Sequence, residues 1–112
     1  MELKYTIDQF AQEPILLIHG DIGYEDGTMG DQFVKELMYL DTLNKSRIQV
    51  WMNSGGGVVT DGEQMCHAIL KSKTPVDTYN TGTCASIAYP IFACGRKRYM
   101  MDFAKNMFHN PF

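Results

Sequence analysis

The chain has 112 residues, of which 45% are hydrophobic and 21% charged, and its formal net charge is −3. This length predicts one domain, or part of one, with enough apolar material for a core. The charge balance argues against nucleic-acid binding, since the densest cationic run is Arg96-Lys97-Arg98. No stretch has the pattern of a secretory signal or the apolar length of a membrane span, so neither is expected.

The chain contains three cysteines: Cys66, Cys84 and Cys94. Their odd number and the lack of a C-x-x-C spacing argue against a disulfide framework or a zinc site. The three histidines form neither H-x-x-x-H nor H-E-x-x-H. We therefore expect no metal and no other cofactor, and a reducing compartment such as the cytoplasm fits best.

Hydrophobic patterning predicts the elements of the first half. Residues 1–13 are weakly patterned and are expected to form an N-terminal arm, with residues 14–112 as the core domain. The continuous apolar run 15–19 predicts a strand buried on both faces. Residues 20–30 read as a loop, with Asp31 capping a helix that runs to about residue 43. A second buried strand is expected over residues 48–52.

The second half repeats the alternation of strand and helix. Residues 53–57 form a glycine-rich turn, and a helix is predicted from about residue 58 to residue 71, where Thr74-Pro75 follows. A strand over residues 76–80 precedes a turn at Gly82 and an apolar helix over residues 85–94. Residues 98–101 and 106–108 are short strand candidates. This order predicts an α/β fold with mostly parallel strands.

Ser86 is the first candidate for chemistry. It lies in Gly82-Thr83-Cys84-Ala85-Ser86-Ile87-Ala88, where a glycine-led turn leads into a helix of small residues. A serine hydroxyl becomes nucleophilic when a base accepts its proton. The free N–H of Ile87 at the helix start could then bind a developing oxyanion. The structural alternative is that Ser86 is only a helix N-cap.

A glycine cluster and a histidine could complete such a site. Gly55-Gly56-Gly57 follows a predicted strand, and its bare backbone could donate N–H groups to a ligand. The phosphate-loop spacings G-x-x-x-x-G-K-[ST] and G-x-G-x-x-G are absent, and a flexible turn is the alternative. His109 could act as general base or be structural. His19 and His67 lack matching partners and are read as structural.

The order of these motifs resembles the proteolytic subunit of the Clp protease, the ClpP family. That family carries an Asn-Ser-Pro-Gly-Gly turn, a Gly-x-x-Ala-Ser nucleophile motif and a Met-x-His-x-Pro histidine motif. The corresponding runs here are Asn53-Ser54-Gly55-Gly56-Gly57, Gly82-Thr83-Cys84-Ala85-Ser86 and Met107-Phe108-His109-Asn110-Pro111. The resemblance covers residues 15–112 and implies a crotonase-like fold of stacked ββα units.

The resemblance also implies roles for single residues and for the whole protein. Ser86 matches the nucleophile and His109 the base of a serine endopeptidase that works through an acyl-enzyme. Such an enzyme cleaves unfolded polypeptides inside homo-oligomeric rings, fed by an AAA+ ATPase, without a cofactor. The remaining matches are the oxyanion donors Gly57 and Ile87, and Gly56 and Val58 in the strip that binds extended substrate.

The sequence departs from the family's pattern in three ways. Gly55 replaces the family's proline, and the stretch from Ser86 to His109 is slightly short, which indicates a trimmed hairpin. The family's triad aspartate lies downstream of the histidine, beyond a helical handle. Asp102 precedes His109 and does not match that position. The sequence is therefore expected to be a truncated form without the handle and the acid-bearing region.

Two alternatives to an active peptidase stay open. The first is an inactive or truncated ClpP-like subunit with a role in assembly. The second is a crotonase-like enzyme that uses the glycine pocket on acyl-CoA thioesters and does not need Ser86. The fold by itself does not decide among them, because function is a property of the site.

Overall fold

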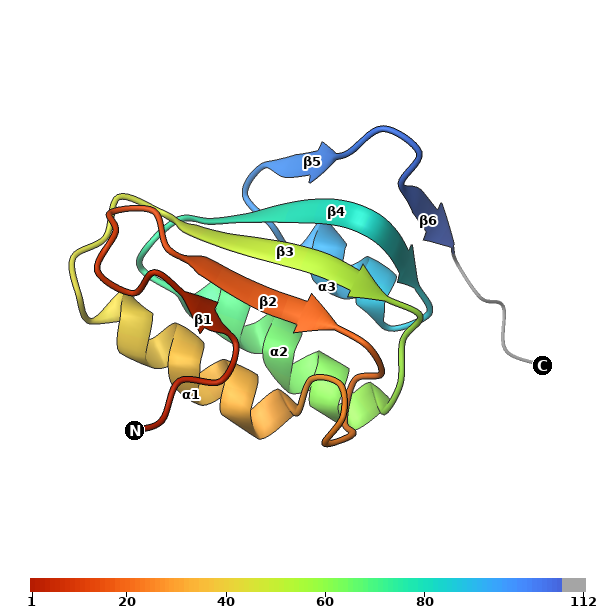
Figure 1. Cartoon of the computed structure of the whole chain (residues 1–112), viewed down its shortest axis with the longest axis horizontal. Helices are drawn as coiled ribbons and strands as arrows, with labels where there is room; N and C mark the ends of the chain where they lie inside the picture. The colour runs from red at the N-terminus through yellow and green to blue at the C-terminus, as the bar shows by residue number, and fades with distance from the viewer. Residues whose placement is uncertain (108–112) are drawn as a thin grey trace.

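A computed structural model describes residues 1–107, which form a six-stranded sheet with three helices (Figure 1). The strands are β1 (Thr6–Ile7), β2 (Ile15–His19), β3 (Ile48–Ser54), β4 (Val76–Ala85), β5 (Arg98–Met100) and β6 (Lys105–Met107). The helices are α1 (Gly30–Asp41), α2 (Val59–Lys71) and α3 (Ala88–Ala93). The predicted alternation of strands and helices is therefore present.

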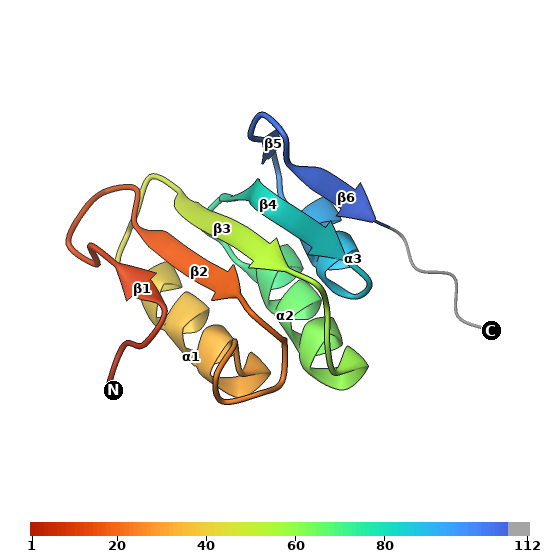
Figure 2. The same cartoon turned by 45° about the vertical axis from the view of Figure 1, so that its right-hand side comes forward.

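The sheet has the strand order β1-β2-β3-β4-β5, and β6 pairs with the far end of β4. Only β1 runs antiparallel to its neighbour; the pairs β2–β3, β3–β4, β4–β5 and β4–β6 are parallel. Successive parallel strands are added in one direction, and crossovers share one hand, so the helices lie on the same face. Figure 2 shows α1, α2 and α3 together on that face.

The core lies between the sheet and the helices. Its strand side consists of alternate residues of β2 and β3, and its helix side follows from the helical spacing of apolar residues. Fully or almost fully buried members include Leu16, Ile18, Val50, Met52, Phe33, Leu37, Leu40, Met65 and Ile69. The prediction that the first strand is buried on both faces is wrong: Ile15 and Leu17 are only half-buried. They lie on the sheet face that the helices leave uncovered.

Strand β4 is longer than predicted. The expected turn at Gly82 and the helix start at residue 85 are wrong, because β4 continues to Ala85 and α3 begins at Ala88. The extension pairs with β6, from Thr83 opposite Lys105 to Ala85 opposite Met107. This partner is distant in sequence, so local patterning could not indicate it.

One further prediction about the first half needs correction. Asp31 does not cap α1, whose N-cap is Met29; instead the Asp61 carboxylate accepts a hydrogen bond from the Gly30 N–H at 2.9 Å. Residues 6 and 7 of the expected arm join the sheet as β1. Among residues 1–107, no helix has the length and apolar character needed to cross a membrane.

Candidate active site

Ser86 lies between the end of β4 and the start of α3, and its side chain is exposed. Its φ of +53° is in the left-handed region, which a residue with a Cβ adopts at a cost of roughly 1–2 kcal/mol. The N-cap of α3 is Ile87, without a side-chain capping bond. The N-cap interpretation of Ser86 is therefore wrong, and the strained turn presents its hydroxyl to solvent.

The glycine loop after β3 contacts this serine directly. A Cβ on Gly56 would lie 2.7 Å from the Ser86 Cβ and 3.2 Å from its Oγ, and Gly56 has a φ of +110°. Only glycine fits this approach without strain. The Ser54 hydroxyl holds the loop, because it accepts from the Gly56 N–H at 3.1 Å and donates to the Gly20 carbonyl at 2.7 Å.

Gly57 presents its N–H on the side of the loop opposite Ile22. The Ile22 N–H donates to the Gly56 carbonyl at 2.9 Å, and the Val58 N–H donates to the Ile22 carbonyl at 2.8 Å. Because backbone groups alternate along an extended segment, the N–H of Gly57 points away from this partner. Within residues 1–107, the N–H groups of Gly57 and Ile87 have no hydrogen-bond acceptor. Both are free to meet an oxygen atom.

Helix packing fixes Ile87 relative to the glycine loop. Any Cβ on Gly62 of α2 would collide with the Ile87 side chain, so the two helices touch there. Helix α2 starts directly after the loop, with Val58 as its N-cap. The segments that carry the N–H groups of Gly57 and Ile87 are thus locked to each other.

The structure brings four of the predicted site positions together: Ser86, Ile87, Gly56 and Gly57. Val58 is adjacent, but Ile22 already occupies its N–H. His109 lies outside the described residues. The last described residue, Met107, ends β6. Its carbonyl accepts a hydrogen bond from the Ser86 N–H at 3.1 Å. The β6 strand is therefore part of the surroundings of Ser86.

Cysteines offer no competing nucleophile in this region. Burial raises the pKa of the Cys84 thiol, two residues before Ser86, to about 12. Burial, together with the neighbouring Cys94, raises the pKa of Cys66 to about 12. Thiolates are the reactive form, so both groups are poorly reactive at neutral pH. Residues 1–107 contain no group of three or more His, Cys, Asp or Glu side chains that could hold a metal ion.

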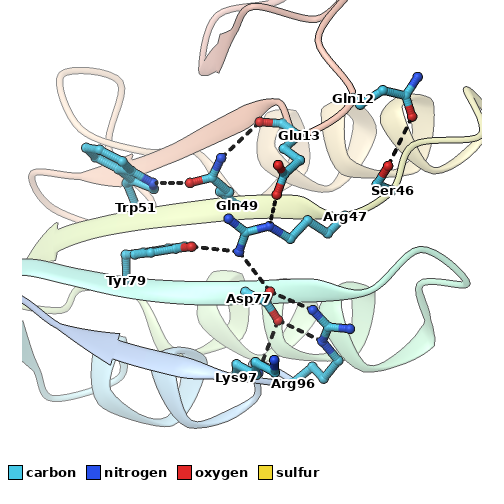
Figure 3. Close-up of polar contacts among 10 residues, drawn as sticks. All are labelled: Gln12, Glu13, Ser46, Arg47, Gln49, Trp51, Asp77, Tyr79, Arg96 and Lys97. Carbon is cyan, nitrogen blue, oxygen red and sulfur yellow. Dashed lines mark hydrogen bonds and ion pairs between the residues drawn. The ribbon is translucent and has the colours of Figure 1, made fainter.

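Sequence reasoning missed a polar cluster on the uncovered sheet face (Figure 3). The buried Asp77 carboxylate accepts from Arg47 at 2.9 Å, from Arg96 at 2.9 and 2.8 Å, and from the Lys97 N–H at 3.2 Å. Burial acts to raise the pKa of Asp77, but these hydrogen bonds outweigh it and lower the pKa to about 2. An aspartate inside a strand is unusual and could have signalled this cluster.

Comparisons with known proteins agree with this architecture. A family model described as Clp protease matches residues 2–112. The ATP-dependent Clp protease proteolytic subunits of Carsonella ruddii (strain PV) and Pleurastrum terricola are 33% and 36% identical to this chain. These alignments cover 92% and 89% of this chain, but 53% and 51% of the relatives.

Solved structures give the same result. ClpP1 from Listeria monocytogenes superposes with a TM-score of 0.78 at 26% identity, covering 87% of this chain and 56% of that one. The ClpP protease catalytic domain from Plasmodium falciparum gives 0.77 at 28% identity, covering 87% and 53%. The predicted fold class, an α/β crotonase-like fold with mostly parallel strands, is confirmed.

The fold defines a class of α/β proteins with a mostly parallel sheet, in which an exposed serine after one strand contacts a glycine loop after the neighbouring strand. Within that class, the chain belongs to the Clp protease family. It spans about half the length of the curated relatives that it matches.

Proposed function

We propose that this chain carries the nucleophile and oxyanion pocket of a serine endopeptidase subunit, with Ser86 as nucleophile. The observation that carries the proposal is the contact between Ser86 and Gly56, beside the N–H groups of Gly57 and Ile87, which have no acceptor among residues 1–107. An exposed serine on a strained turn next to backbone donors is the arrangement that acyl transfer requires.

The proposed reaction starts when Ser86 Oγ attacks the carbonyl carbon of a peptide bond and loses its proton to a base. The N–H groups of Gly57 and Ile87 bind the oxyanion, and water later hydrolyses the acyl-enzyme. His109 is the proposed base. This role rests on the match of Met107-Phe108-His109-Asn110-Pro111 to the histidine motif of the family.

The remaining expectations about the whole protein are part of this proposal. The relatives are named as proteolytic subunits of an ATP-dependent protease, which supports unfolded polypeptides as substrates and an AAA+ ATPase as partner. A homo-oligomeric ring and a cytoplasmic location are proposed on the same resemblance.

A fluorophosphonate probe tests the proposal, because it forms a covalent adduct only with an activated serine. Intact-mass spectrometry should show one adduct on the chain, absent from Ser86→Ala. Ser46→Ala is the matched control, since Ser46 is exposed and hydrogen-bonds only to Gln12 among the described side chains. It should keep the adduct.

A folded chain without an adduct would contradict the peptidase proposal. If that chain instead bound an acyl-CoA thioester, and Ser86→Ala bound it equally well, the crotonase-like alternative would replace the proposal. Absence of both activities would favour a subunit with a role in assembly alone.

A further inference from the structure

The segment from β5 to β6 buries little apolar surface. Every residue from 98 to 107 is exposed apart from the half-buried Ala104, and Phe103 is 98% exposed. Apolar packing therefore contributes little to its position. Yet β6 ends at Met107, whose carbonyl binds the Ser86 N–H. Hydrogen bonds therefore hold β6 beside the serine: those of its short ladder with β4 and a buried side-chain interaction next to that ladder.

The Asn80 side chain supplies that interaction. It is fully buried, at the point where β4 changes its partner from β5 to β6. Its Nδ2 donates to the Lys105 carbonyl at 2.9 Å and to the Asn106 Oδ1 at 2.8 Å. Its Oδ1 accepts from the Gly82 N–H at 3.0 Å. The carboxamide thus joins β4 to the Lys105 backbone and to the Asn106 side chain of β6.

The Asn80 backbone holds the other strand of the segment. Its carbonyl accepts from the Met101 N–H at 3.0 Å, directly after β5. One residue of β4 therefore binds the segment on both sides of its loop. Because the carboxamide is buried and fully paired, replacing it leaves buried polar groups without partners, which destabilises this part of the sheet.

We propose that Asn80 is a positioning residue for Ser86: it holds β6 in register with β4, so that the Met107 carbonyl fixes the Ser86 backbone. The proposal rests on the proposed function for its catalytic meaning. The chain of contacts runs from the Asn80 carboxamide through β6 to the Ser86 N–H, and each step is a hydrogen bond of 3.1 Å or less.

Asn80→Asp is the test variant, because it keeps the shape and the acceptor for Gly82 but removes the donor to β6. Thr78→Val is the matched control. Thr78 is also buried in β4, but its hydroxyl donates to the Phe92 carbonyl of α3 at 2.7 Å. Thr78→Val loses one buried hydrogen bond and Asn80→Asp loses two, and only those of Asn80 reach β6.

The first readout is amide hydrogen exchange, which needs no activity. Asn80→Asp should raise exchange of the Ser86 amide at least tenfold over Thr78→Val. A buried carboxyl has a raised pKa and can donate when protonated. Protection of Ser86, corrected for intrinsic exchange, should therefore recover in Asn80→Asp as the pH falls from about 7 to about 5. A purely structural loss of stability would not recover.

The second readout is the rate of fluorophosphonate labelling at equal folded fraction. Asn80→Asp should label at least tenfold more slowly than Thr78→Val. If Asn80→Asp does not fold, Asn106→Ala replaces it, since Asn106 is exposed and its loss removes one of the two Nδ2 contacts. It should raise Ser86 exchange and slow labelling by about two- to threefold, which corresponds to a net hydrogen bond of about 0.5 kcal/mol.

The outcomes separate this proposal from the proposed function. Equal Ser86 exchange in the Asn80 or Asn106 variant and in Thr78→Val would overturn the role of Asn80. A wild-type chain that takes no adduct overturns the proposed function and, with it, the catalytic meaning of the contact. Faster exchange with unchanged labelling would show that Asn80 holds β6 but does not position the nucleophile.

Discussion

Different kinds of side chain hold the two edges of the sheet in place. At one edge, the buried Glu36 carboxylate of α1 accepts from the N–H groups of Lys4, Tyr5 and Thr6 at 2.9–3.0 Å. At the other edge, Asp77 holds the start of the β5 segment and the neutral Asn80 holds its end. Figure 1 shows β1 and β5 on opposite sides of the sheet.

The difference follows the distance of each interaction from Ser86. Carboxylates hold the parts of both edges that lie away from Ser86, where several donors converge on a charge. Beside Ser86, the interaction is an uncharged carboxamide with a donor and an acceptor. A neutral group keeps its hydrogen bonds across the whole pH range. We therefore expect the attachment through Asp77 to be pH-sensitive and the position of β6 to be insensitive.

Among changes at the two edges, Asp77→Ala should lower the free energy of unfolding most. Removing the carboxylate leaves Arg47 with the Glu13 carboxylate and Arg96 without this partner, and the loss of a buried, fully hydrogen-bonded charge costs roughly 3 kcal/mol. Urea denaturation should show the loss as a lower free energy of unfolding. Glu13→Gln is the control, because Glu13 is half-exposed and should cost less than about 1 kcal/mol. Equal effects would mean that burial of Asp77 does not matter.

Acid should remove the same stabilisation gradually. The pKa of Asp77 is about 2 in the folded chain and about 4 when unfolded, so folding favours its ionised form. The contribution, about 2 kcal/mol, is complete above pH ~4 and is lost as the pH falls towards ~2. The difference in unfolding free energy between wild type and Asp77→Asn should shrink over that window. A difference that is constant with pH would refute the assignment.

Glu36→Gln should have a smaller effect at the opposite edge. The amide group of glutamine would face backbone donors, so one or two hydrogen bonds are lost at a cost of about 1–2 kcal/mol. Amide exchange at Tyr5 and Thr6 should accelerate, while exchange at Ser86 should stay unchanged. Acceleration at Ser86 as well would mean that the two edges are coupled, and would contradict the view that separate side chains hold them independently.

Arg96→Lys should have the smallest effect. Lysine keeps the charge but loses the paired contacts that Arg96 makes to both oxygens of Asp77. The Arg96 side chain is 49% exposed, so solvent screens the pair and the expected loss of stability is small. Urea midpoints of Arg96→Lys and Arg47→Lys would rank the two partners. If Arg96→Lys lowered the urea midpoint more than Arg47→Lys, the more exposed arginine would contribute more stability, contrary to this expectation.

The sequence predicted the elements whose signals are local. Strand β2 has the predicted bounds, and α1 and α2 differ from prediction by one or two residues at most ends, because apolar periodicity defines them. The end of β4 and the start of α3 could not be predicted, since pairing with β6 overrides the turn signal of Gly82.

The candidate site shows the same division. Motif order indicated Ser86 and the glycine loop, and the structure places them in contact. The left-handed backbone of Ser86 was not predictable, because no local rule assigns a positive φ to serine. The roles of Asn80 and Asp77 were not predicted either, although polar residues inside a predicted strand are a usable signal for buried hydrogen-bond partners.

The central claim is that the N–H groups of Gly57 and Ile87 form an oxyanion pocket for Ser86. Amide NMR spectra of the chain before and after fluorophosphonate labelling test it most directly, because the phosphoryl oxygen of the adduct occupies the oxyanion position. The account predicts one adduct on Ser86, with large downfield shifts and slower exchange at the amides of both Gly57 and Ile87. An adduct that leaves both amides unchanged, or no adduct at all, would contradict it.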